Sequence, residues 1–216
     1  MTASRHTADA RETAAERLSR RLPTLTTPRL ILRPFDPAAD LEPLARIARD
    51  ADTMRYLAHG RPWTHQESVE MIGRHVAQYG HGLGFGAVLD KATGEFAGWA
   101  GVQNPKRWPK MMVDLELPCD VIEVGWTLAP PWRGRGYATE AARAWLGYGF
   151  ASLGLEEIIA VHDVPNVASE RVMDRLGMTR RHTFSLTDGS RMCLHATDRH
   201  AWRTTAAADG PAQRLR

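Results

Sequence analysis

Residues 130–141 read PPWRGRGYATEA, and they place two glycines immediately before a helical pattern. A helix that begins near Gly136 leaves about four backbone N–H groups without partners and carries about half a positive charge at that end. Gly134 and Gly136 have no Cβ, so an anion can approach the main chain closely. Arg133 and Arg135 add positive charge on either side of Gly134. The stretch therefore predicts a binding site for a phosphate or pyrophosphate group.

Two familiar phosphate-binding loops do not fit this spacing. A P-loop requires lysine followed by serine or threonine after its last glycine, but Gly136 is followed by Tyr137 and Ala138. A dinucleotide-binding loop requires a third glycine or an alanine, and counting from Gly134 that position is Thr139. The spacing therefore excludes a P-loop and disfavours a dinucleotide-binding loop.

Strand and helix patterns alternate on both sides of the loop. Strands are indicated by β-branched and aromatic residues, and helices by capping residues such as Asp36 and by the Thr64–Glu67 capping box. The pattern predicts a mixed α/β (α+β) domain with one central sheet. The expected strands are 29–35, 84–89, 95–103, 121–128, 158–162, 180–186 and 191–197, and the expected helices are 37–50, 64–79, 136–151 and 166–176.

Composition excludes several classes of protein. The chain has 216 residues, of which 43% are hydrophobic and 25% charged, as in an ordinary globular domain. It has no apolar run of membrane-spanning length and no signal-like start, so we expect a cytoplasmic protein without membrane contact. The net charge of +3 is scattered, and only three of the 28 basic residues are lysine, so we expect no direct nucleic-acid binding. Cys119 and Cys193 lack metal spacing, as do the histidines at 59, 65, 75 and 81, so we expect no metal.

The pattern divides the chain into three parts. Residues 1–22 form an arginine- and alanine-rich arm that is compatible with a surface helix. Residues 23–198 form the predicted domain, and residues 199–216 form a C-terminal tail. An irregular stretch at 104–120 is long for a connection between strands, which is typical of functional loops. The sequence leaves open whether the chain forms a homodimer.

Three separate segments resemble one superfamily. Arg133, Gly136 and Ala138 match the pattern Arg-x-x-Gly-x-Ala within EVGWTLAPPWRGRGYATEA at 123–141. NVASERVMDRLGM at 166–178 and TPRLILRPF at 27–35 match two further signatures in the right order. The chain from about 25 to 197 thus resembles the Gcn5-related (GNAT) N-acetyltransferases, in the branch of the ribosomal-protein-alanine N-acetyltransferases (RimJ/RimL-like).

The resemblance implies a mostly antiparallel sheet, flanked by helices and splayed in the middle between 121–128 and 158–162. Acetyl-CoA, the implied cosubstrate, would enter there, with its pantetheine paired to main chain at 126–128 and its pyrophosphate on the amides of 133–138. The side-chain amide of Asn166 would contact the pantetheine or the adenosine side of the cosubstrate. Asn166 could instead only cap its own helix, or it could do both, and Arg135 could be a solvated surface charge. The implied cofactor-binding residues are Trp126, Thr127, Leu128, Arg133, Gly134, Arg135, Gly136, Tyr137, Ala138, Thr139 and Asn166.

Amine acylation needs a base for the amine proton and a donor for the developing oxyanion. The resemblance implies Glu123 as the base, with a structural salt bridge as the alternative, and a backbone N–H near Leu128 as the oxyanion donor. Many relatives have a tyrosine acid where this chain has Met173. Ser169 is therefore the candidate acid that protonates or stabilises the leaving thiolate. Ser169 could instead hydrogen-bond to the main chain of its own helix. The coenzyme A thiolate could also leave without an acid.

The acceptor amine is less well specified. The resemblance implies a protein N-terminus, and the same branch also contains enzymes for small amines such as amino sugars, aminoglycoside-like molecules or polyamines. A module that binds acyl-CoA without catalysis is a third reading. Trp63 and Trp108 lie on segments that wall the acceptor side in relatives, where we expect specificity to be set.

Overall fold

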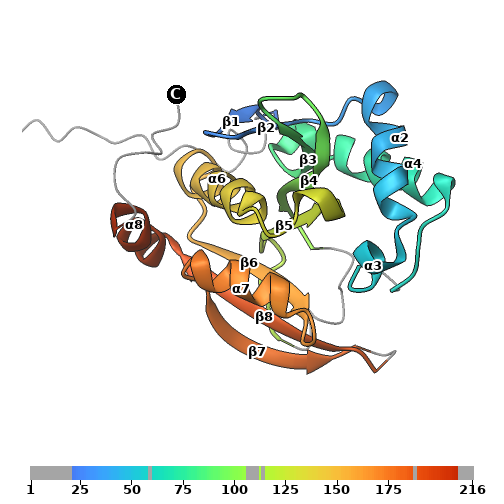
Figure 1. The fold of residues 1–216 in the computed structure, drawn as a ribbon. Helices are drawn as coiled ribbons and strands as arrows, with labels where there is room; N and C mark the ends of the chain where they lie inside the picture. Colours follow the sequence, from blue (N-terminus) through green and yellow to red (C-terminus); the bar gives the residue numbers. More distant parts are fainter. Residues whose placement is uncertain (1–20, 58–59, 106–111, 113–114, 187–188, 209–216) are drawn as a thin grey trace, which may run out of the picture.

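The computed structural model describes residues 21–57, 60–105, 112, 115–186 and 189–208. In this part of the chain eight strands form one sheet in the order β1-β2-β3-β4-β5-β6-β8-β7 (Figure 1). All neighbouring pairs are antiparallel except β5 and β6, which confirms the mixed, mostly antiparallel sheet. The strands are β1 (Leu25–Thr26), β2 (Leu30–Arg33), β3 (Gly84–Asp90), β4 (Phe96–Gln103), β5 (Glu123–Leu128), β6 (Glu157–Asp163), β7 (Thr179–Ser185) and β8 (Arg191–Asp198).

The predicted helix starts are confirmed by their caps. The Asp36 side chain accepts from the amides of Ala38 and Ala39, and Thr64 and Glu67 form the reciprocal capping box. No described helix is long and apolar enough to cross a membrane. The helices are α2 (Pro37–Ala48), α3 (Ala51–Met54), α4 (His65–Val76), α6 (Tyr137–Ala151), α7 (Val167–Arg175) and α8 (Arg199–Ala208), with short 3₁₀ turns η1 (Tyr79–His81) and η2 (Pro130–Trp132).

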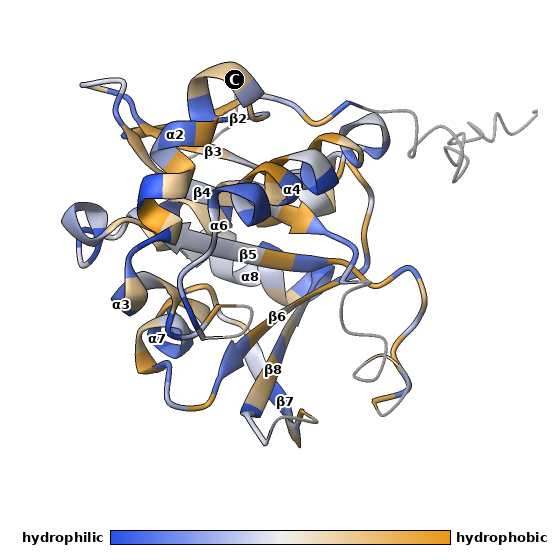
Figure 2. Ribbon diagram, turned by 90° about the vertical axis from the view of Figure 1, so that its right-hand side faces the viewer, coloured by the Kyte–Doolittle hydropathy of each residue, from blue (hydrophilic) through white to orange (hydrophobic). Residues whose placement is uncertain are grey.

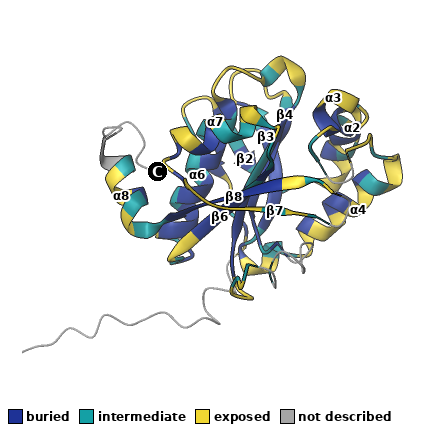
Figure 3. Cartoon of the chain, turned by 90° about the horizontal axis from the view of Figure 1, so that it is seen from below, coloured by how far each residue is buried: buried dark blue, intermediate teal, exposed yellow. Residues whose placement is uncertain are grey.

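Helices cover both faces of the sheet. On one face, α6 buries Trp145 and Leu146 against Val88, Ala100 and other strand residues. On the opposite face, α2 and α4 pack a second apolar cluster on Phe85 and Trp99. Figure 2 shows helices with both hydrophilic and hydrophobic stretches, as amphipathic helices require, and Figure 3 shows buried central strands beside exposed helix faces. The core thus lies in two layers, one on each side of β2–β5.

The sheet parts between its two halves. β5 and β6 are in register at a single pair, Glu123 and Ile159, where the Ile159 amide donates to the Ile122 carbonyl at 2.9 Å. By contrast, β6 and β8 pair along their full length. In Figure 1 the orange and red strands therefore diverge from the blue and green half beyond this point. The splay predicted between these two strands is present.

Several boundaries differ from the sequence prediction. The helix expected over 37–50 ends at Ala48, because Asp50 caps the separate short helix α3. The helix expected to reach residue 79 ends at Val76, and the strand expected from 121 begins at Glu123. β1 was not predicted. Residue 199, where we placed the start of a tail, begins α8, whose Trp202 packs on Phe150. The N-terminal arm falls outside the described residues, apart from residues 21 and 22.

Candidate active site

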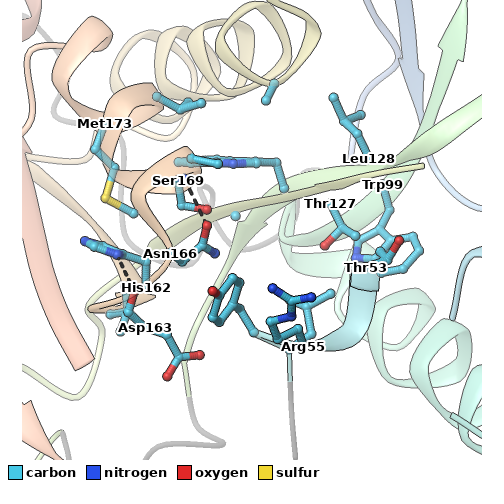
Figure 4. A pocket seen from close by; sticks show the side chains of 18 of the residues that line it. Thr53, Arg55, Trp99, Thr127, Leu128, His162, Asp163, Asn166, Ser169 and Met173 are labelled. Carbon is cyan, nitrogen blue, oxygen red and sulfur yellow. Dashed lines mark hydrogen bonds between the residues drawn. The ribbon is translucent and has the colours of Figure 1, made fainter. Parts of the chain in front are cut away.

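A cleft of about 820 Å³ opens where β5 and β6 part. This volume lies within the range of roughly 300–1,000 Å³ that is typical of ligand sites. Its lining includes Glu123, Ser169 and every predicted cofactor-binding residue except Arg135. Figure 4 shows side chains of β5, α3 and the start of α7 around this space. The fold thus brings together residues that are up to 46 positions apart in the predicted site, from Glu123 to Ser169.

The glycine loop has the conformation that its sequence suggests. Gly134 and Gly136 have φ values of 71° and 81°, which residues with a Cβ rarely adopt. Gly136 is the N-cap of α6, and no side chain caps this helix end. The Thr139 hydroxyl in the first turn is buried, and it has no hydrogen-bond partner in the described part of the chain. An uncapped helix start and an unpartnered buried hydroxyl, both on the cleft, are suited to an anionic ligand.

The main chain of β5 also faces the cleft. The Ala129 amide donates to the Ala97 carbonyl of the neighbouring chain segment. Because main-chain groups alternate in an antiparallel ladder, those of Leu128 and Trp126 point away from β4 and toward the parted side. The Leu128 carbonyl accepts from the Arg133 side chain at 3.0 Å, which agrees with this direction. The amides at 126 and 128 are therefore placed to pair with an extended ligand.

The arginines of the loop have side-chain contacts that the sequence did not indicate. The Arg133 guanidinium contacts Asp52 at 3.0 Å and Thr53 at 2.5 Å, and so joins the loop to α3. Arg135 lies over the ring of Trp132, with 5.2 Å between the guanidinium carbon and the ring centroid, and its carbonyl accepts from Arg29. The Arg133 side chain thus connects the glycine loop to α3.

A buried polar pair holds the start of α6 to the sheet. The Tyr137 hydroxyl donates to the Asp90 carboxylate at the end of β3. This hydrogen bond raises the pKa of Tyr137 and lowers that of Asp90. Glu140 in the same turn accepts from Arg29 at 2.7 Å and from Thr27 at 2.6 Å. The loop end of α6 is therefore fixed on two sides before any ligand binds.

Glu123 lies at the base of the parted region. Its side chain is 4% exposed, and it accepts a hydrogen bond from Gln103 at 3.0 Å. It also forms the one registered pair between β5 and β6. A buried carboxylate that lines a cleft is a candidate for proton transfer.

The start of α7 carries the other predicted residues. Asn166 is the N-cap of α7, and its Oδ1 accepts from the Ser169 amide at 3.2 Å (Figure 4). The expected capping role is therefore present. Ser169 is half-buried on the cleft, one turn before Met173, whose side chain is 1% exposed. The thioether of Met173 cannot donate a proton, as the sequence indicated.

Aromatic side chains line the part of the cleft nearest α3 and α4. Trp63 and Trp99 stack with centroids 6.2 Å apart, and His75 stacks on Phe85 at 4.6 Å. His75 Nδ1 accepts from the Phe85 amide, so this nitrogen carries no proton. The sequence alone does not indicate a role for His75, because its contact with Phe85 joins α4 to β3 and forms only in the folded chain. Trp108, also predicted here, lies outside the described residues.

The fold agrees with comparisons to known proteins. The family model described as "Acetyltransferase (GNAT) domain" matches residues 29–179. The chain is 33% identical over 168 residues to the FsC-acetyl coenzyme A-N(2)-transacetylase of Aspergillus fumigatus. The aligned region covers 75% of this chain and 67% of that protein. The chain belongs to the GNAT family, and it is an acetyl-CoA-dependent N-acetyltransferase.

Solved structures support the same fold. An acetyltransferase from Agrobacterium tumefaciens matches with a TM-score of 0.68 at 25% identity, over 82% of this chain and 95% of that one. RimL, a ribosomal-protein acetyltransferase solved in complex with coenzyme A, matches with a TM-score of 0.63 at 15% identity, over 84% and 99%. At that identity the likeness to RimL shows the fold alone, and membership of its branch stays a prediction.

Proposed function

We propose that the cleft binds acetyl-CoA along β5 and the glycine loop, and that an amine attacks the acetyl group directly in a ternary complex. The cosubstrate supplies an activated acetyl thioester. The observation that carries the proposal is the uncapped start of α6, with Gly134, Gly136 and the unpartnered Thr139 hydroxyl beside it. The diphosphate would lie on these amides, and the pantetheine would follow the amides of Trp126 and Leu128.

In this proposal Glu123 takes the proton of the acceptor amine, either directly or through a water molecule. Its burial, its bond from Gln103 and its place on the cleft support the role. The Leu128 amide, turned away from β4, is the donor for the oxygen that becomes negative. Both groups lie on β5, so a single strand would position the base and the oxyanion donor.

Ser169 is proposed to stabilise or protonate the leaving thiolate. It is half-buried on the cleft at the first turn of α7, and Asn166 holds its amide. Asn166 has its amide NH₂ group available in addition to the Oδ1 used for capping, and we propose that it also contacts the pantetheine side of the cosubstrate. Arg133 would act on the loop through Asp52 and Thr53 as much as on a phosphate.

We propose a protein N-terminal amine as the acceptor, on the resemblance of residues 123–141 and 166–178 to the ribosomal-protein branch. One observation favours a second candidate. The second candidate is a small-molecule amine, because the relative from Aspergillus fumigatus is named FsC-acetyl coenzyme A-N(2)-transacetylase, a name that mentions no ribosomal protein. The aromatic wall formed by Trp63 and Trp99 would suit the apolar part of either acceptor.

The test is thiol release from acetyl-CoA by the purified chain with a panel of amines. The panel contains peptides with free N-termini, the same peptides with blocked N-termini, amino sugars and polyamines. Rapid release with free but not blocked peptides supports the protein acceptor, and release with small amines alone supports the second candidate. Tight acetyl-CoA binding without release for any amine would overturn catalysis and leave a binding module.

A further inference from the structure

Three donor side chains meet beneath α7. One of them, His162, also lines the cleft, but none of the three has a part in the proposed reaction. His162 on β6 lies opposite Cys193 on β8, and His195 follows two residues later on the same face of β8. One ligand atom of each residue lies within 4.8 Å of the others, and all three residues are buried. Cys193 Sγ and His195 Nδ1 are 3.8 Å apart, and the two imidazole rings are 5.2 Å apart.

The hydrogen bond of His162 leaves a buried lone pair. Its Nδ1 lies 2.8 Å from the Asp163 carbonyl, which can only accept, so Nδ1 carries the proton. In the neutral ring Nε2 therefore has a lone pair. This nitrogen is buried, in a residue that is 4% exposed, and it has no hydrogen-bond partner among the residues that the structure describes. Figure 4 shows this ring below Met173, with Nε2 on the side of the ring away from Asn166. Buried polar atoms without partners are rare, so this nitrogen needs an explanation.

A metal-bound histidine usually donates its other ring N–H to a carbonyl or carboxylate, as His162 does to Asp163. Zinc binds both imidazole nitrogen and thiolate sulfur, and a zinc site with three protein ligands keeps a fourth position for water. We propose that His162, Cys193 and His195 form a zinc-binding site that joins β6 to β8 beneath α7.

Geometry and charge are compatible with this assignment. Tetrahedral zinc bonds of about 2.0–2.3 Å place ligand atoms about 3.3–3.6 Å apart, so the most distant pair would close by about 1 Å through side-chain rotation. A zinc ion with one thiolate keeps one positive charge. Glu170 and Asp174 on α7 act on His195 with negative charge, and Arg180 on β7 acts in the opposite sense.

The sequence contains one feature that points to this site, the pair Cys193-x-His195, which the usual spacing patterns of metal sites do not include. Cys193-x-His195 has the alternation that puts both side chains on one face of a strand. His162 joins them only through the pairing of β6 with β8, which spacing along the chain cannot show. The expectation of no metal rested on linear spacing alone.

Cobalt titration of the metal-free full chain tests the proposal. Bound Co²⁺ should give the visible bands of a tetrahedral ion and a thiolate-to-cobalt charge-transfer band, saturating at one ion per chain, and Zn²⁺ should abolish both. Cys193→Ser should remove the charge-transfer band. His195→Gln should weaken binding by at least about tenfold, since even outer-shell partners are worth 10- to 100-fold.

Two matched variants serve as controls. Cys119→Ser changes the other cysteine, which is exposed, and His182→Gln changes an exposed histidine on β7. Both should bind Co²⁺ as the wild type does. In case Cys193→Ser fails to fold, the wild type alone gives a second readout, because Zn²⁺ should slow the alkylation of Cys193 relative to the metal-free chain and leave the rate at the exposed Cys119 unchanged. No Co²⁺ bands, bands that are lost in Cys119→Ser, or a Cys193 alkylation rate that Zn²⁺ does not change would overturn the site.

Discussion

Arg133 in the glycine loop and Asp52 on α3 form an ion pair with 3.0 Å between guanidinium and carboxylate. The same guanidinium also donates to the Leu128 carbonyl and to the Thr53 hydroxyl. The pair joins the proposed phosphate loop to the segment that forms the opposite wall of the cleft. The ion pair thus links the proposed phosphate loop directly to α3.

Asp52→Asn separates two roles for Arg133. If Arg133 acts by tying the loop, Asp52→Asn and Arg133→Ala should both weaken acetyl-CoA binding, by about 2- to 5-fold for an exposed pair worth up to about 1 kcal/mol. If Arg133 instead holds a phosphate directly, Asp52→Asn should leave the Kd unchanged or lower it. Calorimetry with acetyl-CoA measures both variants, and an unchanged Kd for Asp52→Asn contradicts the tie.

Gly134→Ala should damage both the fold and the binding of the cosubstrate. A Cβ at φ 71° costs about 1–2 kcal/mol, and here it would project where the diphosphate is proposed to lie. Gly94→Ala is the matched control, because Gly94 has φ 73°, is equally open around its Cβ and lies in the β3–β4 turn. Both variants should lose similar thermal stability, and only Gly134→Ala should raise the Kd for acetyl-CoA. Equal Kd values would contradict the loop assignment.

Glu123→Gln tests the proposed base. A general base contributes about 10²- to 10⁴-fold, so kcat should fall by that factor, and the limb of the pH–rate profile that reports its ionisation should disappear. The Kd for acetyl-CoA should stay within experimental error, since Gln keeps the size of the side chain. An unchanged profile with retained kcat would assign Glu123 to a structural role.

Glu67 should stabilise α4 in a pH-dependent manner. Hydrogen bonds from Arg61 and from the Thr64 amide lower the pKa of Glu67 from its ordinary 4.5 to about 2. Because the folded-state pKa is lowered, this stabilisation is complete above about pH 4.5 and is lost as the pH falls toward 2. The difference in Tm between wild type and Glu67→Gln should be constant near neutral pH and shrink below pH 4.5. A difference that grows in acid would contradict the assignment.

The sequence predicted best the features that depend on neighbouring residues. The caps at Asp36 and Thr64, the glycine loop and the start of α6 are local and are all present. The contacts that it missed depend on tertiary pairing. His75 reaches the cleft wall by accepting from Phe85, Arg133 turns toward α3, and His162 meets Cys193 across two strands. Periodicity does not encode such partners.

The most direct test of the central claim compares acetyl-CoA with acetyl-pantetheine, which carries the same thioester but no diphosphate. Calorimetry on the purified chain should show binding of acetyl-CoA to the wild type and binding of acetyl-pantetheine that is weaker by at least about tenfold, or about 1.4 kcal/mol. The difference should shrink in Gly134→Ala. Equal affinity for the two compounds in the wild type would contradict the claim that the amides at the start of α6 hold the diphosphate.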